Sequence, residues 1–278
     1  MVYLLLAIAS SSVLSIVMRL SNGKTRSQFT MIATNYLVCA ILGALYTDVS
    51  ALGQHTGGLG LTAGLGVING AILPLGLILL HYSTKKNGIV LSSLFMKLGL
   101  LVPFVMSIVF FGEMPTWLQV AGFVTAIGAI VLFNVKKEGE KDRFGIALIL
   151  LLLANGAADA LVKIFEEVGP EPLSDLFLCF SFVVAFVLSV GLILYHKERP
   201  DGKALLFGAL IGVANFFSFK FLLAALTQVP AVVAFPTFSV AAMLTVTLSG
   251  VLFFKERLSK RQWLAFAGVI VALALLNI

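Results

Sequence analysis

Charged side chains are scarce in this sequence: Asp, Glu, Lys and Arg together make up 12% of its 278 residues. A soluble globular domain carries about 25%, whereas hydrophobic residues here reach 60% and the mean hydropathy is +1.07. This composition excludes an ordinary soluble domain and indicates an integral membrane protein. Because long apolar stretches recur through the whole chain, we expect many crossings of the lipid bilayer, with little sequence left for a soluble domain.

Residues that carry metal, redox or nucleophilic chemistry are also few. The chain has two cysteines, Cys39 and Cys179, and three histidines. Both cysteines fall inside apolar stretches, where we expect small packing residues rather than a disulfide framework or a metal site. The histidines are scattered over loop and interface positions, so no set of catalytic groups converges at one depth. We therefore predict no catalytic site, no metal and no cofactor.

Ten apolar stretches of about 20 residues, separated by polar or Gly/Pro turns, predict ten transmembrane helices. The first has no basic residues before it and no small-residue cleavage site, so we expect a retained helix rather than a signal peptide. The predicted spans are residues 2–20, 27–46, 59–80, 88–111, 116–134, 144–165, 173–195, 204–226, 230–254 and 261–277.

Sixteen of the nineteen Lys and Arg residues fall in alternate connections between these spans. Short cytoplasmic loops are enriched in Lys and Arg, so the alternation supports ten spans and predicts that both chain ends lie outside the cytoplasm. It also explains the formal net charge of +6 by membrane orientation, and we expect no nucleic-acid partner. The basic connections hold Arg19, Lys24, Arg26, Lys85, Lys86, Lys136, Lys137, Lys141, Arg143, Lys197, Arg199, Lys203, Lys255, Arg257, Lys260 and Arg261. The other connections hold Asp48, Glu113, Glu166, Glu167, Glu171 and Asp175.

One short pattern occurs twice, as FFGEMPTWLQ from Phe110 to Gln119 and as FFKERLSKRQ from Phe253 to Gln262. The two copies are 143 positions apart, and at this offset residues 83–134 align with residues 226–277 without a gap. An offset of 144 brings Arg19 onto Lys163. The sequence therefore predicts an internal duplication, with a first repeat over residues 1–138 and a second over residues 139–278.

Each predicted repeat has five helices, an odd number, so the second must enter the membrane upside down relative to the first. Equivalent loops then face opposite sides, which explains why one copy of the pattern is basic and the other nearly free of basic residues. We thus expect an all-α integral membrane protein of ten transmembrane helices, built as two inverted five-helix repeats. Such proteins usually bind substrate near the midplane between the halves and expose it alternately to each side.

With Phe-Gly-Glu at residues 111–113, Phe-Lys-Glu at residues 254–256 and Gly-rich helices after both, the sequence resembles the drug/metabolite transporter superfamily in its ten-helix EamA-like form. The resemblance covers essentially the whole chain. It implies a cavity lined by helices 1 to 4 and 6 to 9, with helices 5 and 10 peripheral. The family includes exporters of amino acids and other metabolites, along with importers and exchangers, and its motifs say little about substrate.

Lys97 is the main candidate for substrate binding. It lies ten residues into the fourth span, so a rise of about 1.5 Å per residue places it near the middle of a hydrocarbon core about 30 Å thick. A charge at that depth costs at least about 2.5 to 3.5 kcal/mol on insertion scales and usually faces a cavity or a partner. We expect a cavity-facing cation that meets substrate. Pairing with a carboxylate of another helix, or carrying a coupling proton, are the alternatives.

Polar side chains in other spans reach a similar depth. Asn69, Asn155 and Asn215 are candidate substrate ligands, although asparagine also bridges helices by hydrogen bonding. Tyr36 is a candidate for the pocket wall, with core packing as its alternative. Lys220 lies about six residues from the outer end of the eighth span, where it either binds substrate or extends towards the headgroups.

Three residues are assigned to coupling, gating or surface roles. Asp159 is the one acidic residue clearly within a predicted span and is a candidate for proton titration or gating, with a helical ion pair to Lys163 as the alternative. Lys163 itself is expected in a solvated cluster with the neighbouring Glu166 and Glu167. Pro103, six residues after Lys97, removes a backbone hydrogen bond, so a bend there could accompany gating.

The sequence as a whole predicts a secondary active transporter in a cell membrane, by default the bacterial inner membrane. An anionic or zwitterionic small metabolite, such as an amino acid or organic acid, suits an unpaired Lys97 better than a cation does. A proton is a candidate coupling ion. Alternatives are an exporter of drug-like or cationic amine compounds, a channel, or a membrane-embedded enzyme.

Overall fold

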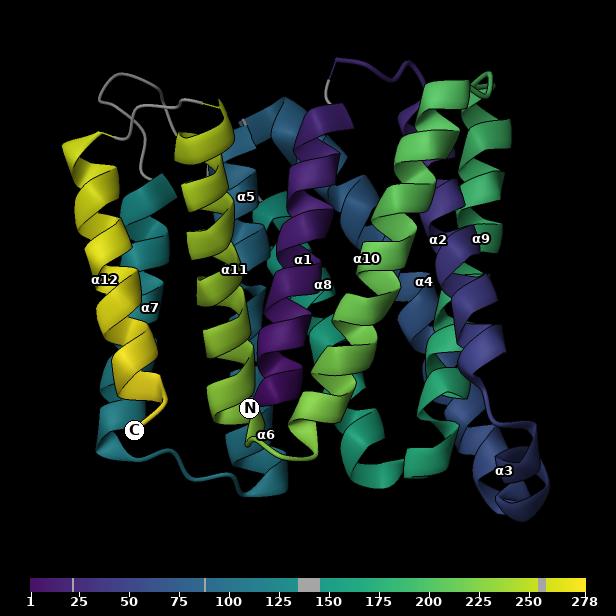
Figure 1. The fold of residues 1–278 in the computed structure, drawn as a ribbon, viewed down its shortest axis with the longest axis horizontal. Coiled ribbons are helices and arrows are strands. Elements are labelled where there is room, and N and C mark those ends of the chain that lie inside the picture. The colour runs from purple at the N-terminus through teal and green to yellow at the C-terminus, as the bar shows by residue number, and fades with distance from the viewer. Residues whose placement is uncertain (22, 88, 135–145, 255–258) are drawn as a thin grey trace. The chain divides into compact units, whose positions relative to one another are not determined.

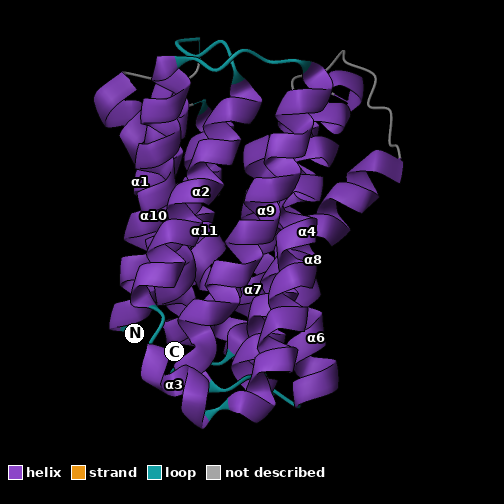
Figure 2. Cartoon of the chain, turned by 90° about the vertical axis from the view of Figure 1, so that its right-hand side faces the viewer, coloured by secondary structure: helices purple, strands orange, loops and turns teal. Residues whose placement is uncertain are grey.

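The computed structural model describes all residues except 22, 88, 135–145 and 255–258. The described chain consists of helices joined by short loops, and no strand occurs in it (Figures 1 and 2). The α-helices are α1 (Val2–Ser21), α2 (Gln28–Tyr46), α3 (Val49–Gln54), α4 (Thr56–Asn87), α5 (Ile89–Lys97), α6 (Leu101–Phe111), α7 (Trp117–Asn134), α8 (Ile146–Val168), α9 (Ser174–His196), α10 (Gly202–Leu226), α11 (Ala231–Phe254) and α12 (Lys260–Leu276). Two short 3₁₀ helices are η1 (Leu98–Leu100) and η2 (Glu171–Leu173).

The all-α membrane architecture is confirmed. In the described residues, eight spans are long and apolar enough to cross a bilayer, and the apolar helices α7 and α12 are shorter. All ten predicted spans therefore correspond to helices. The small helix α3 is an addition, since its region was expected as a loop.

The boundary between the third and fourth spans differs from the prediction. Helix α4 runs for 32 residues and includes Lys85 and Lys86 in its last turn, and α5 begins at Ile89. The two lysines thus end a helix instead of forming a loop, which their long stems permit at a membrane interface. Among the other basic connections, Lys136, Lys137, Lys141, Arg143, Lys255 and Arg257 lie outside the described residues.

The chain packs as two compact units, which are described separately. The first unit comprises residues 1–74 and 161–228, and the second comprises residues 75–160 and 229–278. Each unit takes helices from both halves of the sequence, so these packing units differ from the expected repeats. The proposed division between residues 138 and 139 lies outside the described residues and stays a prediction.

In the first unit, two crossings of the same kind bring helix backbones together. Gly66 and Gly70 of α4 face α9, where a Cβ on Gly70 would lie 2.3 Å from the Ser181 carbonyl oxygen. Gly208 and Gly212 of α10 face α2, where a Cβ on Gly212 would lie 2.7 Å from the Asn35 carbonyl oxygen. Small residues four apart permit such close approach in membranes.

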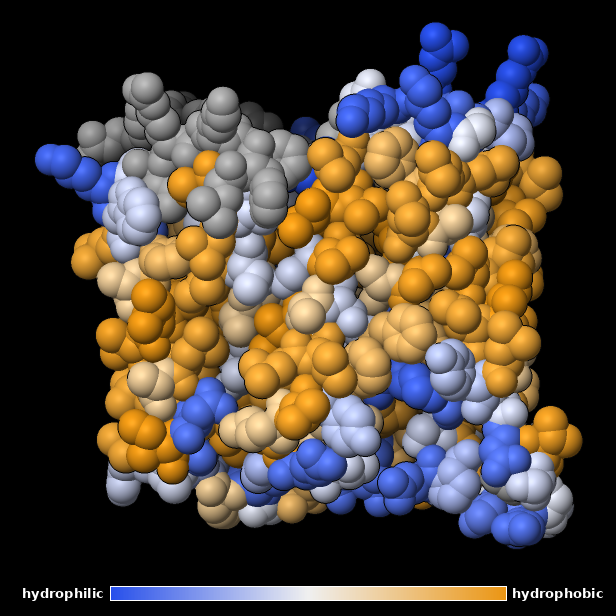
Figure 3. Space-filling view, viewed as in Figure 1, coloured by the Kyte–Doolittle hydropathy of each residue, from blue (hydrophilic) through white to orange (hydrophobic). Residues whose placement is uncertain are grey.

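Acidic side chains form hydrogen bonds between two loops at one end of the first unit. The Glu198 carboxylate accepts hydrogen bonds from the Ser27 hydroxyl and from the Phe29 N–H (3.1 Å), and so caps the start of α2. Nearby, the Arg26 N–H donates to Asp201 at 3.2 Å. These contacts join two of the basic connections at the same end of the unit. Its hydrophilic side chains gather at the helix ends, with a hydrophobic middle between them (Figure 3).

In the second unit, α7 and α12 pack antiparallel. A Cβ on Gly122 near the start of α7 would lie 3.0 Å from Leu275 near the end of α12, and one on Gly268 would lie 3.4 Å from Ala129. Both helices begin with a capping box. In α7 the Thr116 N–H donates to Gln119 Oε1 at 2.9 Å, and in α12 the Ser259 N–H donates to Gln262 Oε1 at 2.9 Å. The glutamines of the duplicated pattern are therefore helix-capping residues.

Candidate functional site

The fourth predicted span of the chain lies in the second unit and is interrupted next to Lys97. Helix α5 ends at Lys97, the 3₁₀ turn η1 follows over Leu98–Leu100, and α6 begins at Leu101. Pro103 has no N–H with which to bond the carbonyl of Gly99, so it contributes a local cause for the break. Short 3₁₀ segments within a helix often mark hinges. The bend expected at Pro103 and its part in gating stay predictions.

Lys97 is partly exposed, and its ammonium has no hydrogen bond or ion pair among the residues that the structure describes. The other two lysines assigned to spans are both paired with carboxylates. The alternative in which Lys97 serves as a helix-to-helix ion pair therefore has no support in the described chain. A role of Lys97 in substrate binding stays a prediction.

The turn that follows Lys97 rests directly on α8. A Cβ on Gly99 would lie 3.0 Å from the Gly156 nitrogen, and one on Gly156 would lie 2.5 Å from the Gly99 carbonyl oxygen. Asn155 borders this crossing: a Cβ added to Gly99 would lie 3.2 Å from the Asn155 Cβ. Its amide donates to Leu151 of its own helix at 3.0 Å. The glycine crossing therefore fixes the backbone two residues beyond Lys97.

Replacing Gly156 by alanine should disturb this site. The added methyl group would lie 2.5 Å from the Gly99 carbonyl oxygen in the 3₁₀ turn and 2.4 Å from Val102 Cγ2 of α6, so the turn or α8 must move. Overpacking of this kind typically costs about 1 to 3 kcal/mol, and we expect a lower melting temperature and weaker transport. Gly128→Ala in α7 is the matched control, because nothing lies within 4 Å of its Cβ. Equal behaviour of both variants would show that the crossing is not tightly packed.

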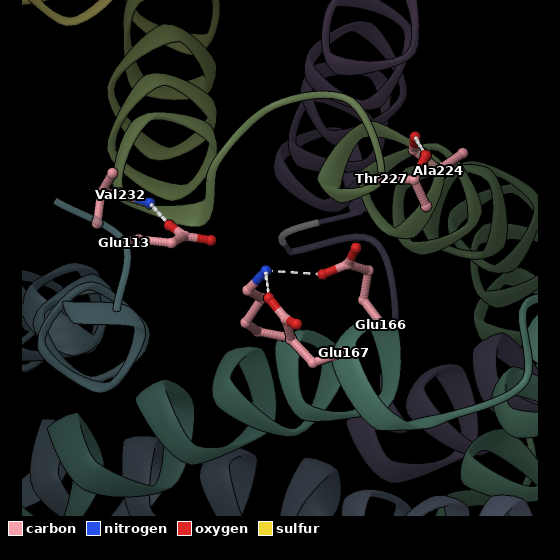
Figure 4. Close-up of polar contacts among 7 residues, drawn as sticks. Glu113, Glu166, Glu167, Ala224, Thr227 and Val232 are labelled. Atoms are coloured by element: carbon pink, nitrogen blue, oxygen red, sulfur yellow. Dashed lines mark hydrogen bonds and ion pairs between the residues drawn. The ribbon is translucent and has the colours of Figure 1, made fainter. Parts of the chain in front are cut away.

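Asp159 follows Asn155 by one helical turn and is partly exposed. The alternative for Asp159, an ion pair with Lys163, is not formed: the Lys163 ammonium bonds Glu166 at 2.7 Å and Glu167 at 2.5 Å (Figure 4). The described chain shows no other ion pair for Asp159. The expected cluster of Lys163 with Glu166 and Glu167 is present, but the expectation that Lys163 is solvated was wrong, since that residue is only 2% exposed.

The candidates in the first unit mostly join helices. Asn215 donates to Asn35 Oδ1 at 3.2 Å and so links α10 to α2. Asn69 donates to the Ser181 hydroxyl at 3.3 Å and links α4 to α9, while its own Oδ1 is buried without a partner in the described chain. Asn35 was missed in the sequence, although it lies in the middle of a predicted span. Both contacts fit the bridging alternative, and a role in substrate binding stays a prediction.

Tyr36 and Lys220 lie in contrasting surroundings. Tyr36 is 4% exposed and stacks on Phe182, with ring centroids 6.2 Å apart, in the core between α2 and α9. Lys220 instead pairs with both carboxylate oxygens of Asp175 at 2.6 Å, and its ammonium lies 4.2 Å from the centroid of the Tyr46 ring. Lys220 is therefore held by protein groups and does not simply extend to the headgroups.

Glu113 of the duplicated pattern has a structural contact that the sequence did not reveal. Its carboxylate accepts a hydrogen bond from the Val232 N–H at 2.9 Å, at the first turn of α11 (Figure 4). A carboxylate at a helix N-terminus satisfies an unpaired N–H and complements the helix dipole. The corresponding Glu256 lies outside the described residues.

Glu113→Ala should lower the stability by about 0.5 to 2 kcal/mol, the usual cost of losing an N-terminal cap. Thermal unfolding in detergent measures it. Glu113→Gln retains an acceptor oxygen and should lose less, whereas Glu171→Ala, an exposed glutamate of the first unit, serves as the control. A Glu113→Ala protein as stable as the wild type would contradict the capping role.

Comparisons with known proteins agree with these observations. Residues 143–278 match the model of the EamA-like transporter family. A Haemophilus influenzae protein described as uncharacterized is 26% identical over 287 residues, covering 98% of this chain and 94% of its own length. A crystal structure matches the fold with a TM-score of 0.70 at 16% identity, covering 99% of this chain and 98% of that one. The second half of the chain is thus similar to the EamA-like transporter family, and the long apolar helices of the described residues indicate a multi-pass membrane protein.

Proposed function

We propose that the protein is a secondary active transporter that moves a small anionic or zwitterionic metabolite by alternating access. The family match supports transport, and the alternating basic connections support a cell membrane, with both chain ends outside the cytoplasm. Candidate substrates are amino acids and organic acids. The predicted inverted duplication supports alternating access, since such repeats commonly rock around a site near the midplane.

We infer the substrate class from the position and the charge of Lys97. An ammonium deep in a span is costly unless it faces water or a partner. In the described chain no carboxylate neutralises this one, and it sits where the helix is broken. A carboxylate or phosphate of the substrate would supply the missing counter-charge, while a purely cationic substrate would add repulsion.

Asp159 and Lys97 also offer a route for coupling. Both are partly exposed, and they flank the Gly99–Gly156 crossing on different helices of the second unit. A proton taken up by Asp159, or by Lys97 when an anionic substrate binds, would link transport to a proton gradient. Uptake into proteoliposomes with and without an imposed pH gradient tests this coupling.

Counterflow in proteoliposomes tests the function directly. Vesicles loaded with an unlabelled amino acid or dicarboxylate should accumulate the labelled compound transiently, in a saturable manner. Choline, a cation without a carboxylate, should give no counterflow. Selective exchange of choline, with no exchange of amino or organic acids, would overturn the proposed substrate class. Flux without saturation would indicate a channel.

A further inference from the structure

A cavity of about 290 Å³ lies at one end of the first unit, away from Lys97 in the sequence. It is formed by the first turn of α1, the start of α9 and the end of α10, all within that unit. A volume near 300 Å³ is at the small end of ligand sites. The cavity therefore suits a small molecule.

One wall of the cavity is the ion pair of Lys220 and Asp175. The side chains of the pair remain 26% and 22% exposed, so both charges are still accessible. Tyr46 and Phe216 lie 4.2 Å and 6.0 Å from the ammonium, measured to their ring centroids, and limit its movement. The pair is thus a fixed positive and negative group beside an open space.

The hydroxyl groups that line the cavity have already used their donor protons. Ser174 donates to the Glu171 carbonyl oxygen at 2.6 Å, and Thr227 donates to the Ala224 carbonyl oxygen at 2.9 Å (Figure 4 shows the second). Each hydroxyl can therefore only accept a hydrogen bond from a ligand. These oxygens favour a ligand that donates several hydrogen bonds.

The charges of the residues that line the cavity also favour a ligand that donates hydrogen bonds. Asp175 neutralises Lys220, and the exposed carboxylate of Glu171 has no hydrogen bond or ion pair in the described chain, which leaves one unbalanced negative charge. An ammonium group matches this charge and the hydroxyl acceptors. Lys220 and the Gln228 amide can hold an anionic group beside it, and Leu178 and Leu223 give an apolar wall.

We propose that this cavity is a second binding site, which takes a small molecule with a primary ammonium next to an anionic group. Two sources carry this chemistry: a free amino-acid-like zwitterion and the headgroup of phosphatidylethanolamine. The site lies in the first unit and does not include Lys97, so it stands whether or not Lys97 binds the transported substrate.

Calorimetric titration of the Lys97→Met protein in nanodiscs tests this site alone. The discs contain phosphatidylcholine and phosphatidylglycerol, and the probes are L-valine, L-valinamide and isovalerate. We expect saturable binding of L-valine, weaker binding of L-valinamide and none of isovalerate. Glu171→Gln should weaken L-valine binding at least about tenfold, whereas Asp48→Asn, an exposed carboxylate that does not line the cavity, should leave it unchanged.

Absence of L-valine binding up to 10 mM (roughly the weakest affinity of interest) would overturn the proposal, as would isovalerate binding as tightly as L-valine. Equal affinity of the Glu171→Gln protein would overturn it too. Discs that contain phosphatidylethanolamine separate the two sources. Weaker L-valine binding there shows that the lipid headgroup enters the same cavity, and unchanged binding assigns the site to the free molecule.

Discussion

Lys97→Met should lower transport at least about 100-fold while the protein stays folded. Methionine has a similar length and is at home in an apolar span, so the change removes the charge and little else. Losing a charge-assisted contact in a desolvated site costs about 2 to 5 kcal/mol, and about 2.8 kcal/mol corresponds to a factor of 100. Removing an unneutralised charge should leave the melting temperature equal or higher.

The matched control for this variant is Lys85→Met, which removes an exposed lysine from the last turn of α4. Its transport should stay within about twofold of the wild type, as is usual for surface changes of less than 0.5 kcal/mol. Counterflow also separates two roles for Lys97. If Lys97 binds substrate, exchange and gradient-driven uptake are both lost, whereas loss of gradient-driven uptake alone assigns it to the proton. Normal transport in both assays would rule out either role.

Lys163→Met should destabilise the protein by about 3 to 5 kcal/mol, the usual cost of removing one partner from a buried ion pair. Lys163 is 2% exposed and bonds two carboxylates, of which the Glu166 side chain is 14% exposed. Without the ammonium, the carboxylates of the consecutive residues Glu166 and Glu167 lose their common partner. The midpoint of thermal unfolding in detergent, at a fixed protein and detergent concentration, measures the loss.

Two further variants serve as comparisons for the stability loss of Lys163→Met. Glu167→Gln affects a side chain that is 35% exposed, so its loss should be below about 1 kcal/mol. Adding Glu166→Gln and Glu167→Gln to Lys163→Met should recover part of the lost stability, because no uncompensated carboxylate then remains at these positions. A Lys163→Met protein with wild-type stability would show that this cluster is solvated after all.

The sequence predicted the membrane spans well because apolar length is a strong physical constraint. Each span needs about 20 apolar residues, and turns cannot be hidden in lipid. The boundary at Lys85 and Lys86 was misplaced for a related reason: charged residues can belong to the last helical turn when they reach the interface. Composition identifies the apolar core of a span better than its ends.

Pairing between polar groups was harder to predict. Sequence spacing allowed Lys163 to pair with Asp159 or with Glu166 and Glu167, and the structure shows the pairs with the two glutamates. Asn35 and Asp175 pair with residues more than 40 positions away, which local periodicity does not detect. The position of a polar residue along its predicted span therefore identified the candidates, whereas their partners depend on how the helices pack.

The duplicated pattern contains a capping signal that could have been recognised in the sequence. A Thr or Ser three residues before each repeated Gln, at Thr116 and Ser259, is the signature of a capping box. The Gly-x-x-x-Gly motifs at Gly66 and Gly208 are 142 positions apart, and their packing partners on α9 and α2, such as Phe180 and Thr34, are 146 apart. Each crossing joins a helix of one half of the sequence to a helix of the other, with the glycine motifs at corresponding positions of the two halves.

Labelling of two engineered cysteines from opposite sides of the membrane tests the inverted arrangement. Trp117→Cys and Lys260→Cys occupy equivalent exposed positions, 143 residues apart, at the first turns of α7 and α12. Each is introduced singly into a protein whose Cys39 and Cys179 are replaced by alanine. We expect a membrane-impermeant maleimide to label the Trp117→Cys protein from outside the cell, and the Lys260→Cys protein only after the membrane is opened. Labelling of both proteins from the same side would contradict two inverted five-helix repeats.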